Sequence, residues 1–239
     1  MSLLAPPRRF DPNCPELIDQ PGIDRALVRE ELELLENINQ RFGGHSLVLH
    51  YVRRLLDSAP AAAPSILDLG TGSADIPRAI AGSFRKFQRP VSITVVDSNP
   101  GVLSCAKESC RGWPEIHLEQ HDLRTLPYAA ESYDLVLCSL ALHHFTSADA
   151  IIILRRMQQI ARVGYIVNDL RRNWSAIWMT NLLARTVFRS PIFRQDASQS
   201  CRAAFTIREL RTMGREAGLR NFRINRHQAG FRMVLAGRK

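Results

Sequence analysis

A glycine-rich turn, set between a short apolar run and a helix-like segment, constrains the fold of this chain more than any other feature. Residues 66–69 read Ile-Leu-Asp-Leu, and Gly70, Thr71 and Gly72 follow at once. Glycine reaches positive φ without steric cost, so such a turn lets a ligand come close to the backbone. The order strand, glycine-rich turn, helix is typical of sheets that bind ligands at their carboxyl edge.

The segments around this turn alternate between strand and helix patterns. We expect strands at 65–69, 91–96, 116–120, 133–139 and 164–168, and helices at 76–83, 100–110 and 148–160. Segments 222–225 and 233–236 would complete the sheet as a hairpin-like pair. The pattern predicts an α/β fold with a doubly wound, mostly parallel, seven-stranded sheet of Rossmann-like type.

Two further segments flank this alternation and divide the chain. Residues 1–63 hold a proline-rich arm up to residue 23 and helix patterns at 24–42 and 46–56. The predicted core spans 64–170, and in 171–205 a helical pattern replaces the alternation, so we expect a helical cap insert there. Residues 206–239, which begin with a helix pattern at 206–218, would then complete the core.

The charge of the turn separates two kinds of ligand. A dinucleotide-binding turn reads G-x-G-x-x-G/A, and here Asp75 occupies the third marked position. A carboxylate at that helix N-terminus would repel a pyrophosphate. S-adenosylmethionine (SAM) carries no phosphate, so the sequence favours SAM over a nicotinamide dinucleotide.

Acidic residues end successive predicted strands and indicate the course of this cofactor. Asp68 is placed to organise the turn or to hold the cofactor ammonium through water, and Asp97 to accept hydrogen bonds from the ribose hydroxyls. Asp122 would accept the adenine amine while Leu123 packs on the ring. The whole predicted cofactor set is Asp68, Gly70, Thr71, Gly72, Asp97, Ser98, Asp122, Leu123, Ser139 and Arg41, the last for the cofactor carboxylate.

With these motifs the chain resembles class I SAM-dependent methyltransferases over about residues 65–170. The segments Leu-His-His-Phe at 142–145 and Asn-Asp-Leu-Arg-Arg at 168–172 resemble small-molecule methyltransferases of ubiquinone and menaquinone biosynthesis. The chain is also similar to bacterial enzymes that methylate polyketide-derived phenols. The resemblance implies O- or C-methylation of a small hydrophobic or aromatic acceptor by in-line displacement. Ala74 departs from the pattern by replacing the frequent third glycine.

Two histidines lie where such an acceptor should enter. His143 and His144 follow the fourth predicted strand, and histidine titrates near neutral pH, so either could serve as the general base. We place His144 slightly ahead, with a structural role for either left open. The five cysteines form no CxxC pair, and we expect no metal site.

The insert carries an apolar stripe among six arginines. We expect Trp174, Trp178 and Leu182, continued by Val187 and Phe188, to line a cap over the acceptor. Ordinary helix packing and a homodimer interface are the alternatives.

The net charge of +9 is uneven, with fifteen Arg or Lys against three acids from residue 171 onward. This region could attract an anionic partner, such as a carrier protein or RNA. An RNA methyltransferase is therefore an alternative function, although 139–142 lack an Asn-Pro-Pro-Tyr segment for a flipped base. A non-catalytic SAM-binding partner protein is a second alternative. No apolar run approaches the roughly 18 residues of a membrane span, and a cytoplasmic location is expected.

Overall fold

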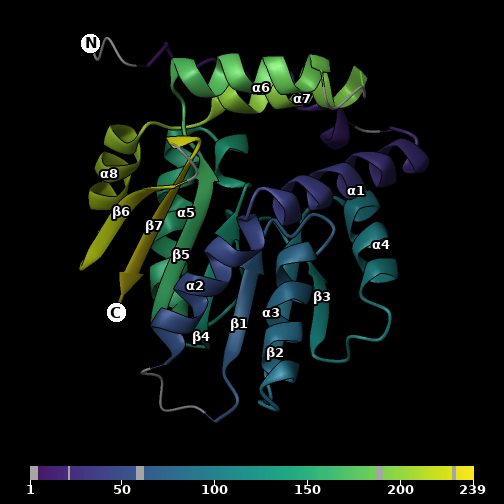
Figure 1. The fold of residues 1–239 in the computed structure, drawn as a ribbon. Coiled ribbons are helices and arrows are strands. Elements are labelled where there is room, and N and C mark those ends of the chain that lie inside the picture. Colours follow the sequence, from purple (N-terminus) through teal and green to yellow (C-terminus); the bar gives the residue numbers. More distant parts are fainter. Residues whose placement is uncertain (1–4, 21, 58–61, 187–190, 228–229) are drawn as a thin grey trace.

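A seven-stranded sheet forms the centre of the molecule (Figure 1). The computed structural model describes residues 5–20, 22–57, 62–186, 191–227 and 230–239. The strands run in the order β3-β2-β1-β4-β5-β7-β6, and β7 is antiparallel to both β5 and β6 while the other neighbours are parallel. Their bounds are β1 Ser65–Leu69, β2 Ser92–Asp97, β3 Ile116–Gln120, β4 Tyr133–Ser139, β5 Ala161–Leu170, β6 Phe222–His227 and β7 Arg232–Arg238. The predicted fold class is confirmed.

Helices cover both faces of this sheet. Helices α2 (Gly44–Leu56), α3 (Asp75–Lys86) and α4 (Pro100–Ser109) pack on one face, and α5 (Ser147–Ile160) and α8 (Ile207–Glu216) pack on the other. Strand side chains alternate between the two cores, so Leu135 and Leu137 contact the first layer while Val136 and Cys138 contact the second. Both faces of the sheet are therefore buried, as the continuous apolar strands predict.

The glycine-rich turn is as tight as its sequence predicts. Gly70 has a φ of +70°, and a Cβ added there would lie 2.4 Å from the Cβ of Ala141. Its backbone N–H donates to the carbonyl of Val96 at 2.8 Å, which fixes the turn against β2. Ala74 adopts a φ of +59° at the start of α3, a left-handed conformation that favours glycine.

A third layer crosses the carboxyl edge of the sheet (Figure 1). It contains α1 (Arg25–Arg41), α6 (Trp174–Thr186), α7 (Pro191–Ala203) and two short 3-10 helices, η1 (Leu17–Asp19) and η2 (Leu142–His144). The helical pattern of 171–200 is thus two helices, and the expected cap residues Val187 and Phe188, with Arg189, lie outside the described residues. No helix among the described residues is long and apolar enough to span a bilayer.

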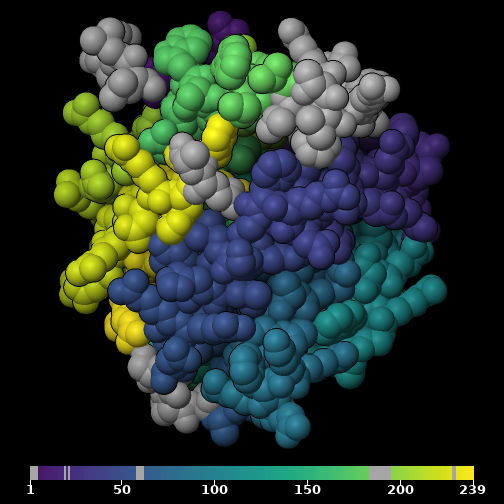
Figure 2. Space-filling model, viewed as in Figure 1, coloured from purple at the N-terminus to yellow at the C-terminus, as the bar shows by residue number. Residues whose placement is uncertain are grey.

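The N-terminal arm, expected as an irregular lead-in, packs against the end of α7. The Arg8 guanidinium donates to the carbonyl of Ala203 at 2.6 Å, and the backbone N–H of Arg9 donates to the carbonyl of Arg202 at 3.1 Å. Farther along the arm, Gln199 donates to the carbonyl of Cys14 at 2.8 Å. Helices α1 and α2 continue from this arm across the middle of the face in Figure 2. The described residues of the arm and α1 therefore lie over the carboxyl edge.

Candidate active site

The carboxylate of Asp68 lies buried at the end of β1, beside the glycine-rich turn. Its Oδ1 atom has no hydrogen-bond partner among the described residues. Burial raises the pKa of Asp68 to about 7, the carboxylates of Asp75 and Asp97 add to this rise, and the Thr71 hydroxyl opposes it. A buried carboxyl with an unused oxygen calls for a cationic donor, such as the ammonium of an amino-acid ligand.

Two more unpartnered polar atoms lie on the same face of the sheet. They are Oδ1 of Asn168, near the end of β5, and Nη1 of Arg232, at the start of β7; both residues are buried. Strand alternation puts both side chains, with Asp68, on the face covered by α2 and α3. A carboxylate and a guanidinium are complementary to the ammonium and carboxylate of an α-amino acid, although Asp68 and Arg232 belong to strands three positions apart in the sheet.

A hydrogen-bonded chain connects Arg232 to the helices above the turn. Its Nη2 donates to Oδ1 of Asn39 at 2.6 Å, and Nδ2 of Asn39 donates to Oδ2 of Asp75 at 2.9 Å. Nε2 of His45 lies 2.9 Å from the same oxygen. Burial opposes ionisation of Asp75, but the bonds from His45 and Asn39 outweigh it and lower its pKa. The acid that argues against a pyrophosphate therefore remains charged and ties α1 and α2 to the turn.

Arg41, selected from the sequence for the cofactor carboxylate, lies exposed in the last turn of α1. A buried guanidinium with an unpartnered nitrogen at this edge belongs instead to Arg232, which the sequence analysis did not select. Arg232 pairs with Leu170 because β7 runs antiparallel beside β5. The start of β7 lies at the carboxyl edge because β7 runs antiparallel to β5. The sequence around Arg232 contains no local motif that would indicate this position.

Asp97, expected at the ribose, ends β2 directly opposite the glycine-rich turn. Its Oδ2 accepts a long hydrogen bond of 3.4 Å from the N–H of Gly72, and its Oδ1 accepts one of 3.0 Å from the N–H of Asn99. Ser98 is exposed, and its carbonyl accepts a hydrogen bond from Gln120 at 3.1 Å. The structure thus brings Asp97 and the turn together as expected.

The two residues expected at the adenine differ in their surroundings. Leu123 is buried beside the turn, 3.8 Å from the point that a Cβ on Gly70 would occupy. Asp122 is paired with Arg124, whose Nη2 lies 2.5 Å from its Oδ2, and this contact lowers the pKa of Asp122. Asp122 would have to share its carboxylate with Arg124 when it accepts an adenine amine.

The two histidines that follow β4 occupy distinct environments. His143 is buried, its Nδ1 lies 2.6 Å from Oδ1 of Asp169, and its backbone N–H donates to the other carboxylate oxygen at 3.0 Å. The His144 side chain is 27% exposed. Just before them, the Ser139 hydroxyl at the end of β4 accepts a hydrogen bond from Nδ2 of Asn168 at 2.9 Å.

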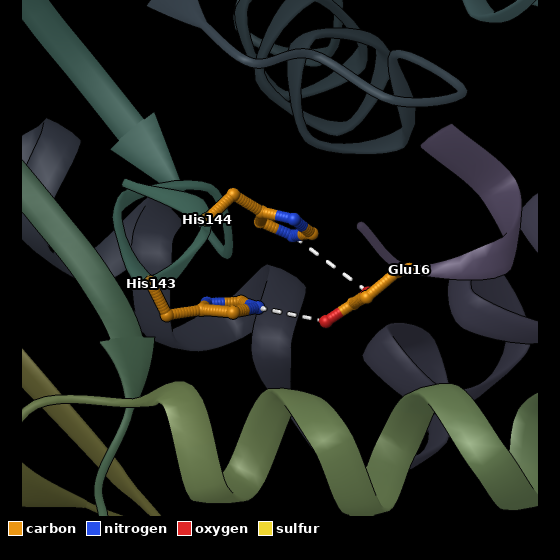
Figure 3. A group of neighbouring side chains, drawn as sticks. All are labelled: Glu16, His143 and His144. Atoms are coloured by element: carbon orange, nitrogen blue, oxygen red, sulfur yellow. Dashed lines mark ion pairs between the residues drawn. The ribbon is translucent and has the colours of Figure 1, made fainter. Parts of the chain in front are cut away.

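Glu16, from the N-terminal arm, faces both imidazoles (Figure 3). Its Oε1 lies 3.9 Å from Nε2 of His143, and its Oε2 lies 3.8 Å from Nε2 of His144. The sequence contains no signal for this approach, because residue 16 belongs to a segment without periodicity. The arm reaches the histidines through its contacts with α7.

A cavity of about 400 Å³ opens beside these three side chains. The arm supplies most of its wall, η2 supplies the histidines and α7 supplies the rest. Its lining residues are Arg9, Phe10, Asp11, Pro12, Cys14, Pro15, Glu16, His143, His144, Gln199 and Ala203. This cavity lies next to the carboxyl ends of β4 and β5, where the polar edge described above is also found.

The expected cap residues do not line this cavity. Trp174, Trp178 and Leu182 are 58%, 64% and 41% exposed, on the outer side of α6. The opposite side of α6 buries Ala176 and Ile177, and α7 is the helix that contacts η2. The apolar stripe therefore faces outward, and α7 with the arm takes the position that the sequence analysis assigned to it.

Comparisons with known proteins agree with this geometry. Residues 66–164, about two fifths of the chain, match a family model described as a methyltransferase domain, in agreement with the resemblance noted from the sequence. No curated protein sequence matches the chain.

Three solved structures illustrate the shared fold. A protein of Nostoc punctiforme, whose name assigns it O-methyltransferase activity only provisionally, has a TM-score of 0.64 and 19% identity over 94% of this chain and 64% of its own. Human N-acetylserotonin methyltransferase in complex with SAM has a TM-score of 0.63 and 17% identity, and the match covers 90% of this chain and 56% of that protein. PigF with S-adenosylhomocysteine (SAH) has a TM-score of 0.64 and 18% identity, and the match covers 90% of this chain and 60% of PigF. The chain thus spans less than two thirds of the length of these proteins.

Proposed function

We propose that this chain, a SAM-dependent methyltransferase, methylates a small hydrophobic or aromatic acceptor that enters the cavity beside His143. The observation that carries the proposal is the Asp169–His143 pair, which lies at the wall of that cavity and follows the strand that borders the glycine-rich turn. When bound, SAM supplies an electrophilic methyl group. The chain's own groups would then position the acceptor and remove its proton.

The cofactor would lie along the carboxyl ends of β1, β2 and β4, and the side chain of Arg232 would have to reach it from the start of β7, where it already contacts Asn39 of α1. Asp68 would face its ammonium, Arg232 its carboxylate and Asp97 its ribose, with Leu123 against the adenine. The unpartnered atoms of Asp68 and Arg232 support the first two assignments. The contact of Asp97 with Gly72 supports the third, because it places an acceptor group at the turn.

His143 would serve as the general base for a hydroxyl acceptor. A carboxylate accepts but does not donate, so the contact with Asp169 places the imidazole proton on Nδ1 and leaves the lone pair on Nε2. That lone pair lies at the cavity wall beside Glu16, where it would take the acceptor proton. The more exposed His144 lies beside it, with ring centroids 4.3 Å apart, and would help to shape the entrance.

The cavity suits a small acceptor with an apolar body. Its volume of about 400 Å³ lies near the lower end of typical ligand pockets of about 300–1,000 Å³. Phe10, Pro12, Pro15 and Ala203 provide apolar wall, while Glu16 and the histidines provide the polar end. A phenol, a quinone precursor or a small polyketide matches this division.

Transfer of labelled methyl groups from SAM to a panel of phenols, quinone precursors and polyketides tests the proposal. We expect turnover on at least one of these acceptors and none on tRNA. Tight SAH binding without turnover on any of them would favour a non-catalytic SAM-binding protein instead.

An anionic macromolecule is a second candidate partner. Exposed Arg211, Arg215 and Arg223 line a groove of about 380 Å³ between α8 and β6. This groove lies four strand positions from β1, or about 19 Å at 4.8 Å per strand, so it suits docking of a carrier or RNA rather than the methylated atom. Binding of tRNA that falls steeply with salt and is lost in Arg211→Ala/Arg215→Ala would support this candidate.

A homodimer through the outward stripe of α6 remains a prediction. The exposed tryptophans are compatible with it, and sedimentation of the intact chain with and without Trp178→Ala tests it.

A further inference from the structure

Three potential metal ligands from two distant parts of the chain converge at the cavity wall (Figure 3). Glu16 comes from the arm, and His143 and His144 come from η2. One carboxylate oxygen and one ring nitrogen from each histidine lie within 4.8 Å of one another. The group lies at a cavity, so its fourth side is open to a small ligand.

A cation would fit between Nε2 of His143 and the carboxylate of Glu16. Asp169 fixes the proton of neutral His143 on Nδ1, so the Nε2 lone pair points toward Oε1 of Glu16 at 3.9 Å. A lone pair that faces a carboxylate is repulsive unless a proton or a metal ion lies between them. His144 meets the other oxygen of Glu16 at nearly the same distance, 3.8 Å, which makes the arrangement symmetrical about one point.

Two carboxylates, those of Glu16 and Asp169, are buried beside the histidines, and Arg9 lines the same cavity. Arg8 lies near Asp169, but its guanidinium donates to the carbonyls of Ala203, His143 and Phe145. A dication would compensate the two buried carboxylates that adjoin the histidines.

The ligands also have the outer hydrogen bonds that are common at metal sites. Asp169 orients His143 through Nδ1, and the Ser200 hydroxyl donates to Oε1 of Glu16. Such partners fix the direction of the coordinating atoms and are typical of His-carboxylate metal centres. Two imidazoles and one carboxylate suit Zn²⁺ and similar first-row ions, whereas Mg²⁺ and Ca²⁺ prefer oxygen ligands.

We propose that Glu16, His143 and His144 bind one Zn²⁺-type transition-metal dication at the wall of the acceptor cavity. Bond lengths of about 2.0–2.2 Å in a tetrahedral site put ligand atoms about 3.4 Å apart, so the present separations, which reach up to 4.8 Å, need to contract by up to about 1.4 Å. The arm and the partly exposed His144 can supply this shift. The metal takes the Nε2 lone pair of His143, so metal binding and proton removal from the acceptor exclude each other.

Metal binding is tested on the full chain after chelator treatment, without cofactor. Calorimetry with Zn²⁺ should show one equivalent bound, and Co²⁺ should give the visible bands of a low-coordinate N/O site. Glu16→Gln and His144→Ala should each weaken Zn²⁺ binding at least tenfold. Thermal melting confirms that the variants are folded.

A surface pair provides the matched control. His121 and Glu119 are 3.2 Å apart and partly exposed, and they belong to no three-ligand group among the described residues. His121→Ala should therefore leave Zn²⁺ binding unchanged. Absence of saturable Zn²⁺ binding, or binding that survives both Glu16→Gln and His144→Ala, would overturn the proposal.

The consequence for catalysis rests on the proposed function and is measured separately. Stoichiometric Zn²⁺ should slow methyl transfer at least tenfold, and EDTA should restore it. Zn²⁺ that binds at this site without slowing transfer would overturn the exclusion between metal and proton. Since binding is read without SAM, a chain that methylates none of the acceptors still tests the metal site.

Discussion

The imidazole of His143 donates from Nδ1 to the carboxylate of Asp169 across 2.6 Å, with both residues almost completely buried. A second contact, from the backbone N–H of His143 to the same carboxylate, holds the two residues at a fixed angle. His143 belongs to η2 after β4, and Asp169 to the end of β5, which is the neighbouring parallel strand. The fold therefore orients this imidazole before any ligand binds.

Cofactor affinity should depend on pH through Asp68. Its pKa is raised to about 7 in the folded chain, so the carboxyl is largely neutral at pH 5.5 and charged above 7. The SAM ammonium prefers the carboxylate, and its own proton is retained in this range because α-amino groups titrate near 7.7–8.0. The Kd for SAH, measured by calorimetry, should fall as pH rises from 5.5 to 7, by up to about tenfold per pH unit. Asp68→Asn should bind more weakly and lose this slope, whereas a slope kept by the variant would assign it to another group.

The Asp68 carboxyl also affects the stability of the cofactor-free chain. The folded pKa lies above the ordinary value of 3.8, so between 3.8 and about 7 the folded state binds more protons than the unfolded state. The contribution of Asp68 to folding therefore becomes less favourable as pH rises through that window. Thermal melting of wild type against Asp68→Asn, with and without SAH, should show this loss only in the cofactor-free wild type.

Arg232, rather than Arg41, should hold the cofactor carboxylate. Arg232→Met removes a buried guanidinium with a free Nη1, so SAH binding should weaken by about 1.5–3 kcal/mol, the range for hydrogen bonds to charged groups. The matched change Arg41→Met alters an exposed side chain and should leave the Kd within about twofold. Calorimetry on both, with melting curves as a check on folding, decides between them. Weaker binding in Arg41→Met alone would restore the expectation drawn from the sequence.

The acceptor should contact the arm rather than the outer stripe of α6. Phe10→Ala removes an aromatic wall of the cavity and should raise the acceptor KM about tenfold or more, as expected for about 1.5–3 kcal/mol of buried apolar side chain. Trp178 is 64% exposed, so Trp178→Ala should leave the KM nearly unchanged. Initial rates at saturating SAM give both values. A larger effect of Trp178→Ala would mean that α6 closes over the acceptor in the working enzyme.

The sequence predicts which residues meet at the carboxyl ends of β1 and β2, because these residues are consecutive or end adjacent strands. Asp68, the glycine-rich turn and Asp97 follow from a strand-turn-helix pattern that local geometry imposes. The acceptor half depends on contacts between segments that are far apart in the chain. Glu16 reaches His143 across 127 positions, and Arg232 reaches Asn39 across 193. Such approaches result from packing of the arm and from strand order, which no local periodicity encodes.

The apolar stripe of α6 illustrates a different limit. Its spacing correctly predicts a helix, but periodicity does not tell which side of the helix is buried. The smaller Ala176 and Ile177 face inward, and the tryptophans face outward.

The most direct test of the proposed function is the turnover number of Asp169→Asn on a small acceptor, at saturating SAM and after chelator treatment. Asparagine keeps the size of the side chain but no longer fixes the proton on Nδ1, so Nε2 of His143 loses its role as base. We expect kcat to fall about 10²–10⁴-fold, with SAH affinity and melting temperature close to those of wild type. A kcat near the wild-type value in the folded variant would contradict base catalysis by His143.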